Sequence, residues 1–221
     1  MLFRSDTEDS AAIRIETVQP ERFSLTEIPD TYQQTVPGYT VMFVFFIIGY
    51  LSSVIRDEKR SGTLRRLLCA PVRVRSLLLG KMASALCIGV VQVAVMFAAG
   101  ALIFGLGLGR DLFALLLVTV ALVASATGLG LAVATTRLGS VLSPILILSA
   151  LLGGCMFPLD LMPPFLRTIS YITPHRWALD GYQDLMVRGQ GLVDVLPNLA
   201  VLLGIAAIGF GVALLRFDAD E

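Results

Sequence analysis

The chain of 221 residues alternates between long apolar runs and short polar segments. Five runs contain no Asp, Glu, Lys or Arg, namely 31–55, 82–109, 112–136, 138–159 and 195–215. A helix needs about 20 apolar residues to cross a hydrocarbon core of about 30 Å. The pattern therefore predicts an all-α polytopic membrane bundle, a single domain over 38–215 with five transmembrane helices at about 38–55, 82–107, 112–136, 140–158 and 196–215.

Composition supports a membrane protein. Only 15% of the residues are charged, 56% are hydrophobic and the mean hydropathy is +0.80, whereas soluble domains carry about 25% charged residues. The net charge is zero, which gives no electrostatic basis for binding nucleic acid. The three cysteines are isolated and His175 is the only histidine, so no metal site is expected.

The polar segments predict one orientation. The segment 56–81 contains eight Lys and Arg residues against Asp57 and Glu58. Lys and Arg are enriched in short cytoplasmic loops, so this segment is expected in the cytoplasm. Alternation then places 1–37 and a re-entrant loop over 159–195 outside the cell, and the tail 216–221 in the cytoplasm.

Small residues recur along the third predicted span. Ala124, Gly128 and Ala132 are spaced by four residues and therefore share one helical face. Small side chains at this spacing let a second helix approach closely in a membrane. The same residues also fit the ordinary Ala and Gly content of membrane helices, and the sequence leaves both interpretations open.

We predict a short amphipathic helix within the basic segment 56–81. Leu64, Leu67 and Leu68 share a helical face, and Arg65 and Arg66 point away from it. A break is expected at Pro71, because proline disfavours helix at the residue before it. Such a helix either lies at the membrane interface or forms a docking surface for a cytoplasmic partner.

This segment resembles a known family. EKRSGTLRRLLCAPV followed by LLLGK is similar to the motif of permeases of the type-2 ATP-binding-cassette (ABC) exporters. The matching residues are Glu58, Lys59, Arg60, Gly62, Thr63, Leu64, Leu67, Leu68, Pro71, Gly80 and Lys81. The resemblance implies that 56–78 forms a coupling loop that rests on a separate ATPase subunit, and thus favours the docking interpretation.

A second region, residues 155–191, also resembles the family, which has a proline-bearing exit, a Met-Pro turn and a Pro-x-x-Trp helix there. The matching residues are Pro158, Met162, Pro163, Pro164, Pro174, Trp177 and Asp180. The resemblance implies short helices that dip into the outer leaflet of the membrane.

The side chains of this region suit a membrane interface. Tyr171 and Trp177 are expected at the level of the lipid headgroups, with His175 and Arg176 as interfacial anchors. The acidic side chains are expected to meet solvent or cap helices; they are Asp160, Asp180 and Asp184.

The resemblance covers about 28–215 and implies the permease subunit of an ATP-driven exporter in a prokaryotic plasma membrane, paired with a second copy or a paralogue. Arg75 and Met82 replace residues that a phosphate-binding loop needs around Gly80–Lys81, so ATP and Mg are expected on the partner. The chain itself is expected to bind no cofactor and to be no enzyme.

Family members typically have six spans, and no apolar run precedes residue 38. The first span is therefore expected to be missing, with 1–37 as the remainder of an extracellular segment. The near absence of charge in the spans favours an amphipathic or lipid-like cargo. The alternative is a non-transporting membrane subunit, truncated or regulatory, whose basic loop binds only lipid or a partner.

Overall fold

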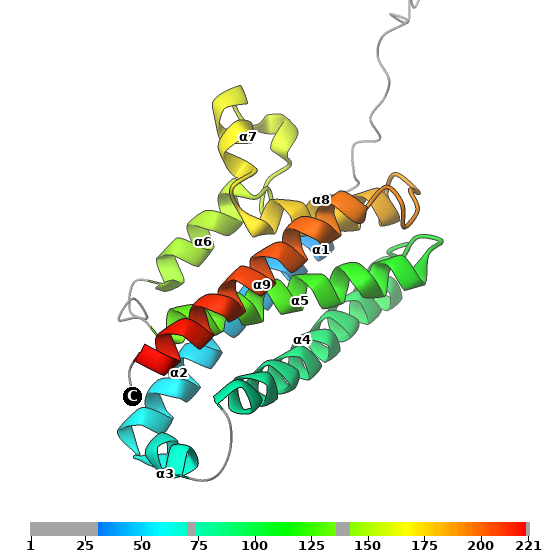
Figure 1. Cartoon of the computed structure of the whole chain (residues 1–221). Helices are drawn as coiled ribbons and strands as arrows, with labels where there is room; N and C mark the ends of the chain where they lie inside the picture. The colour runs from blue at the N-terminus through cyan, green and yellow to red at the C-terminus, as the bar shows by residue number, and fades with distance from the viewer. Residues whose placement is uncertain (1–30, 70–73, 136–141, 220–221) are drawn as a thin grey trace, which may run out of the picture.

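The computed structural model describes residues 31–69, 74–135 and 142–219, and within these ranges the chain is helical without any strand (Figure 1). The expected all-α fold is confirmed for this part of the chain. The α-helices are α1 Thr31–Phe45, α2 Ile47–Arg60, α3 Thr63–Cys69, α4 Val74–Phe104, α5 Leu112–Ala134, α6 Leu142–Leu152, α7 Pro164–Ser170, α8 Pro174–Met186 and α9 Leu196–Ala219. A short 3-10 helix, η2, covers Leu159–Leu161.

Four helices of the described part are long and apolar enough to cross a membrane. They are Thr31–Arg60, Val74–Phe104, Leu112–Ala134 and Leu196–Arg216. The first consists of α1 and α2, which continue one another through a single turn residue, Phe46. This helix begins at Thr31, seven residues before the expected start of the span, and Pro37 lies inside α1 without ending it. Where the helix enters the membrane stays a prediction.

The fourth predicted span differs most from the structure. Residues 140 and 141 lie outside the described ranges, and the described helix, α6, has 11 residues and is therefore about 16 Å long. It ends because Gly154 adopts a left-handed conformation with φ +83°. The amides of Gly154 and Cys155 then donate to the carbonyls of Leu151 and Ala150, which is the Schellman pattern of a helix end. An apolar run alone does not reveal such an end.

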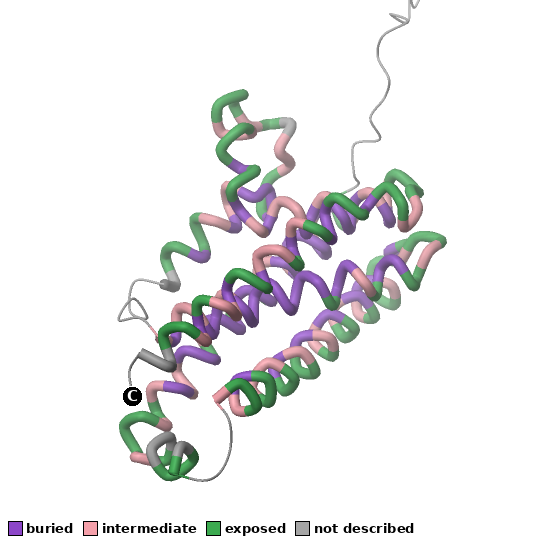
Figure 2. Tube along the Cα trace, viewed as in Figure 1, coloured by how far each residue is buried: buried purple, intermediate pink, exposed green. Residues whose placement is uncertain are grey.

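Helix α5 is the centre of the bundle. Its residues are buried around nearly its whole circumference, as Figure 2 shows. It packs most extensively against α9, and then against α2 and α4. In contrast, α4 has a largely exposed outer face, in keeping with a helix that meets lipid.

Glycines set the distance between α5 and α9. A Cβ atom built on Gly209 would lie 2.5 Å from the backbone carbon of Gly128, so the two backbones are in direct contact. The structure thus places Gly128 of the small-residue face at this contact, with Ala124 buried and Ala132 half-buried. Because dispersion contacts drive helix association in lipid, close approach of this kind stabilises the bundle.

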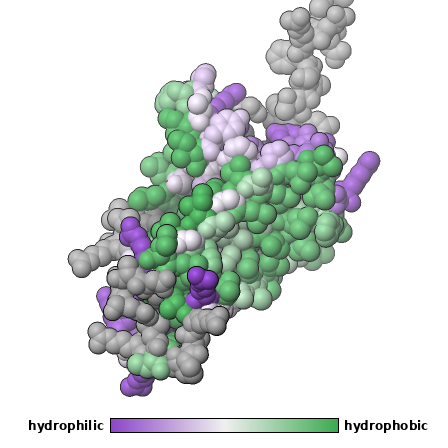
Figure 3. Space-filling model, viewed as in Figure 1, coloured by the Kyte–Doolittle hydropathy of each residue, from purple (hydrophilic) through white to green (hydrophobic). Residues whose placement is uncertain are grey.

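The bundle has two ends. The basic end contains the last turn of α2, helix α3 and the start of α4, and the opposite end contains the start of α1, the loop at Arg110, α7 and α8 (Figure 1). Hydrophilic residues gather at these ends, and the surface between them is apolar (Figure 3). Among the described residues, the segments 56–69 and 159–187 therefore lie at different ends of the bundle. The alternation of loops across the membrane, and the side on which each end lies, stay predictions.

We expect Gly209→Ala to lower the stability of the chain by about 1–3 kcal/mol, because the added methyl group meets backbone that cannot yield locally. Gly211→Ala is the matched control on the same helix, since no atom lies within 4 Å of its Cβ position. The control should be neutral or slightly stabilising, because alanine favours helix over glycine. Thermal unfolding in detergent, followed by circular dichroism, compares the two, and equal midpoints would contradict the packing role.

Candidate functional site: the two ends of the bundle

The turn between α2 and α3 explains the Gly-Thr pair of the motif. Gly62 has φ +72°, a conformation that glycine adopts without steric cost, and its amide donates to the carbonyl of Lys59. The hydroxyls of Ser61 and Thr63 lie 2.9 Å apart across the turn. The chain therefore reverses sharply at Gly62, and α3 begins directly after it.

Helix α3 lies at the basic end, next to the last turns of α2 (Figure 1). Its start at Thr63 confirms that a short helix follows the turn. The side chains of Thr63, Arg66 and Leu67 are exposed, as is Arg60 just before the turn. The expected leucine face is not settled, because the side chains of Leu64 and Leu68, and all of Pro71, lie outside the described part of the chain.

Glu58 pairs with a second residue of the motif, and its expected role in coupling stays a prediction. Both of its carboxylate oxygens accept hydrogen bonds from Nζ of Lys81 on α4, each at 2.6 Å. The two charged groups are half-buried between α2 and α4. Glu58 and the Lys of the Gly80–Lys81 pair therefore contact one another within the chain, whereas Arg60 and Leu67 face outward.

Prolines start the short helices of the opposite end. Pro164 and Pro174 stand in the first turns of α7 and α8, where the missing amide hydrogen costs nothing and the fixed φ suits a helix. Pro158 and Pro163 directly precede η2 and α7. The short helices that the family resemblance implied are thus present in the structure, and their depth in a membrane stays a prediction.

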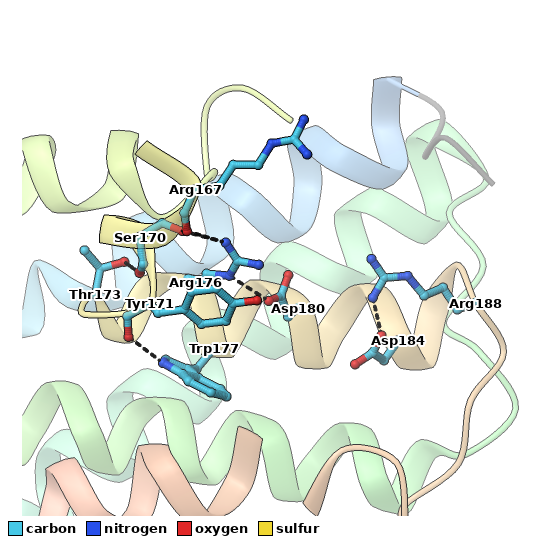
Figure 4. A network of polar contacts seen from close by, with 9 residues as sticks. All are labelled: Arg167, Ser170, Tyr171, Thr173, Arg176, Trp177, Asp180, Asp184 and Arg188. Atoms are coloured by element: carbon cyan, nitrogen blue, oxygen red, sulfur yellow. Dashed lines mark hydrogen bonds and ion pairs between the residues drawn. The ribbon is translucent and has the colours of Figure 1, made fainter. Parts of the chain in front are cut away.

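Arg176 joins α7 to α8 (Figure 4). Its guanidinium donates to Oγ of Ser170 at 2.6 Å and to the carboxylate of Asp180 at 3.1 Å. It also lies over the ring of Tyr171, 3.8 Å from the centroid, and Trp177 donates to the Tyr171 carbonyl. Arg176 is therefore a structural connection between the helices, a role that the expectation of an interfacial anchor did not include.

The acidic residues of α8 are held in ion pairs. Asp180 pairs with Arg176, and Asp184 pairs with Arg188. Burial raises the pKa of Asp180, although the neighbouring Arg176 opposes the shift. Asp180 and Asp184 are half-buried and each pairs with an Arg four positions away, so ion pairing adds to the expected contact with solvent. The Asp160 side chain lies outside the described residues.

His175 is buried, which corrects its expected place at the interface. Its side chain is 1% exposed and stacks on Phe45 of α1 with ring centroids 3.9 Å apart. Neither ring nitrogen has a hydrogen-bond partner. Because water is excluded from the charged form, burial lowers the pKa of His175 to about 3. The imidazole acts as a flat apolar contact between α8 and α1.

An aromatic groove runs along the outer face of α1 and α2 beside α4. It encloses about 390 Å³ and is lined by Phe43, Phe46, Ile47, Tyr50, Ile88 and Gln92. Phe43, Phe46 and Tyr50 are exposed in the chain, and Gln92 provides an amide in an otherwise apolar wall. No charged side chain lines the groove. Within the described ranges, no group of His, Cys, Asp and Glu residues could hold a metal ion.

The comparison with protein families matches almost the whole chain. The model of the ABC-2 family transporter protein matches residues 2–215. The chain belongs to this family. Membership and the long apolar helices together make it a multi-pass membrane protein.

Two curated relatives of this ABC-2 family chain are permeases by name. The linearmycin resistance permease protein LnrN of Bacillus subtilis is 26% identical over 197 residues, which cover 85% of this chain and 50% of the relative. The probable multidrug ABC transporter permease YbhS of Escherichia coli is 25% identical over 189 residues, 82% of this chain and 50% of the relative. The chain thus spans about half the length of these relatives. No solved structure matches it significantly.

Sequence patterns in this ABC-2 family chain did not reveal the contacts between distant helices. Gln183 of α8 donates to Oε1 of Gln34, and Gln34 donates to the carbonyl of Gly154. These residues join α8, α1 and the end of α6 at the opposite end of the bundle. A polar side chain inside an apolar stretch, as at Gln34, was the only local signal for this network.

Acid should destabilise the ABC-2 family chain through His175. Its folded-state pKa lies below the ordinary value of 6.5, so the unfolded chain binds the proton more tightly and stability falls as the pH drops below about 6.5. Between pH 6.5 and about pH 5 the loss should be about 1.6 kcal/mol. Thermal unfolding of the wild type and His175→Gln at several pH values measures it, because the chain has one histidine.

The wild type should lose stability on acidification and the variant should lose less. Asp180 is present in both proteins, so its own pH dependence cancels in the comparison. Parallel pH profiles for the two proteins would contradict a neutral buried His175 in the folded state.

Proposed function

We propose that this chain is the membrane permease part of an ATP-driven ABC exporter, with a separate ATPase subunit as its partner and a second permease chain beside it. The observation that carries the proposal is α3, a short helix with exposed side chains that directly follows the Gly62 turn at the basic end. The names of LnrN and YbhS, which describe resistance and multidrug permeases, support an exporter.

The basic end has the geometry that a coupling surface needs. Helix α3 lies at the tip of the basic end (Figure 1). The helices before and after it, α2 and α4, belong to two of the helices that could cross a membrane. In the proposal, the ATPase subunit contacts α3 in the cytoplasm, and ATP-driven movement of that subunit displaces α3. The bundle then shifts between inward-facing and outward-facing states, because the two states differ in their contacts with the partner.

The aromatic groove is the proposed contact surface for cargo. Exposed aromatic rings offer large apolar area and stacking to a flat or amphipathic compound. Tyr39 stacks on Phe43 with ring centroids 6.2 Å apart, and Phe43 packs in a tilted arrangement against Phe46 at 5.9 Å. The uncharged lining and the single amide of Gln92 favour an amphipathic cargo over an ion.

For the coupling surface, we expect Leu67→Asp to remove copurification of the ATPase subunit. The leucine side chain is exposed on α3, and a carboxylate there opposes burial against a partner. Leu161→Asp is the matched control, because Leu161 is an exposed leucine at the opposite end of the bundle. The measurement is pull-down of the ATPase subunit from detergent extracts, with membrane insertion of each variant checked in parallel.

Retention of the ATPase subunit by inserted Leu67→Asp would contradict docking at α3. If the wild-type chain itself binds no ATPase subunit, the exporter proposal fails, and a non-transporting membrane subunit becomes the better reading.

For the cargo surface, Phe43→Ala and Tyr50→Ala should each weaken stimulation of ATP turnover by an amphipathic aromatic compound, raising its half-maximal concentration about fivefold to tenfold. Phe113→Ala is the control, since Phe113 is also an exposed aromatic residue but does not line the groove. ATP hydrolysis by the reconstituted complex is the measurement. Equal responses in all three variants would exclude the groove from the cargo path.

A further inference from the structure

Two opposite charges occupy the inward faces of neighbouring helices at the basic end. On α2, Leu51 and Ile55 are buried, and Glu58 continues the same face one turn later. On α4, Leu78 and Ala85 are buried, and Lys81 lies on their face between them. Each apolar stripe thus contains one ionisable side chain where an apolar one would pack.

The geometry shows that the two charges satisfy one another. Both Glu58 oxygens lie 2.6 Å from Nζ of Lys81, and the side chains are only 23% and 12% exposed, respectively. Glu58 also stands in the last turn of α2, where the helix dipole disfavours a carboxylate. Its charge is therefore compensated by Lys81 and not by its own helix.

The ion pair differs from an ordinary surface pair. Asp184 stands in the last turn of α8 and Arg188 lies just after the helix, four positions later, so their pairing joins no distant element. Glu58 and Lys81 are 23 positions apart, and α3 lies between them in the chain. The pair closes the α2–α3–α4 segment into a loop whose two ends are held together at the point where α3 leaves the bundle.

Resting on the function proposed above, we propose that the Glu58–Lys81 ion pair is a brace that holds the start of α4 against the end of α2, so that displacement of α3 moves both spans together. Glu58 and Lys81 are then positioning residues. Loss of either charge leaves the other half-buried without a partner, and the two helix ends separate to let water reach it.

The chain carries natural sites for a distance measurement. Cys69 at the end of α3 and Cys87 on α4 are exposed, and Cys155 is buried. Nitroxide labels on the two exposed cysteines report the distance between α3 and α4 in nanodiscs by pulsed electron resonance. This measurement uses the full chain and needs no partner subunit.

If the ion pair acts as a brace, the distance between the labels on Cys69 and Cys87 should have a narrow distribution in the wild type. The distribution should be broad in Glu58→Gln and in Lys81→Met. The exchanged pair, Glu58→Lys with Lys81→Glu, should restore the narrow distribution, because it returns opposite charges to the same positions. Arg188→Gln is the control and should leave the distribution unchanged, since its ion pair with Asp184 is local to the end of α8 and contacts neither α3 nor α4. Narrow distributions in both neutral variants, or a broad one in the exchanged pair, would overturn the proposal.

A second measurement tests transmission in the complex with the ATPase subunit. Glu58→Gln should retain the ATPase subunit in pull-down, yet lose cargo-stimulated ATP turnover by about fivefold or more, and the exchanged pair should recover it. Full stimulation in Glu58→Gln would show that the brace transmits nothing, and would overturn that part of the proposal. If the wild-type chain has no ATPase partner, the proposed function fails, while the distance measurement still decides whether the brace exists.

Discussion

Direct backbone contact between α5 and its neighbours is the constraint on which the rest of the structure depends. Gly128 and Gly209 let the backbones of α5 and α9 touch, and Gly130 brings α5 against the backbone of Ile48 on α2. On α4, the missing side chain of Gly89 leaves room for the side chain of Val123 of α5. Lipid tails are as apolar as leucine, so the hydrophobic effect that holds a soluble core together does not drive helices together in a membrane. Close van der Waals contacts of this kind drive the association of the helices instead. With α5 held on several sides, the ends of the other helices acquire defined positions.

The two ends use those positions differently. At the basic end, polar and charged side chains surround a short helix whose described side chains are exposed, and one ion pair joins the two spans beside it. At the opposite end, Arg176 contacts Ser170, Asp180 and Tyr171 and so connects α7 to α8. The described residues thus present exposed side chains at the basic end and a hydrogen-bonded pair of short helices at the opposite end, in keeping with the proposed docking at α3.

Buried polar groups mark where α8 is fixed to α1. Gln34 and Gln183 hydrogen-bond to one another, so their amides are compensated on burial. His175 has no such partner and stays neutral, with its ring stacked on Phe45. Because charging this imidazole would place an ion in a site without water, the contact between α8 and α1 is sensitive to protonation in a way that the glutamine pair is not.

The sequence by itself determined the helical class and the long apolar helices, because the absence of charge over a span length is a local property. The short helices after residue 158 were implied by the family resemblance, and the prolines in the first turns of α7 and α8 agree with them. The turn at Gly62 was not predicted and was found in the structure. The motif around Gly62 also indicated the family that the comparison with known proteins then showed.

Only the tertiary structure decided which partners distant side chains meet. Glu58 and Lys81 both stood in the motif, yet their pairing depends on the packing of α2 against α4. The burial of His175 depends on Phe45, which lies 130 positions earlier in the chain. A sequence pattern predicts the helix face on which a residue lies. The partner of that residue depends on how the faces of separate helices pack together, and this packing is not determined by neighbouring positions in the sequence.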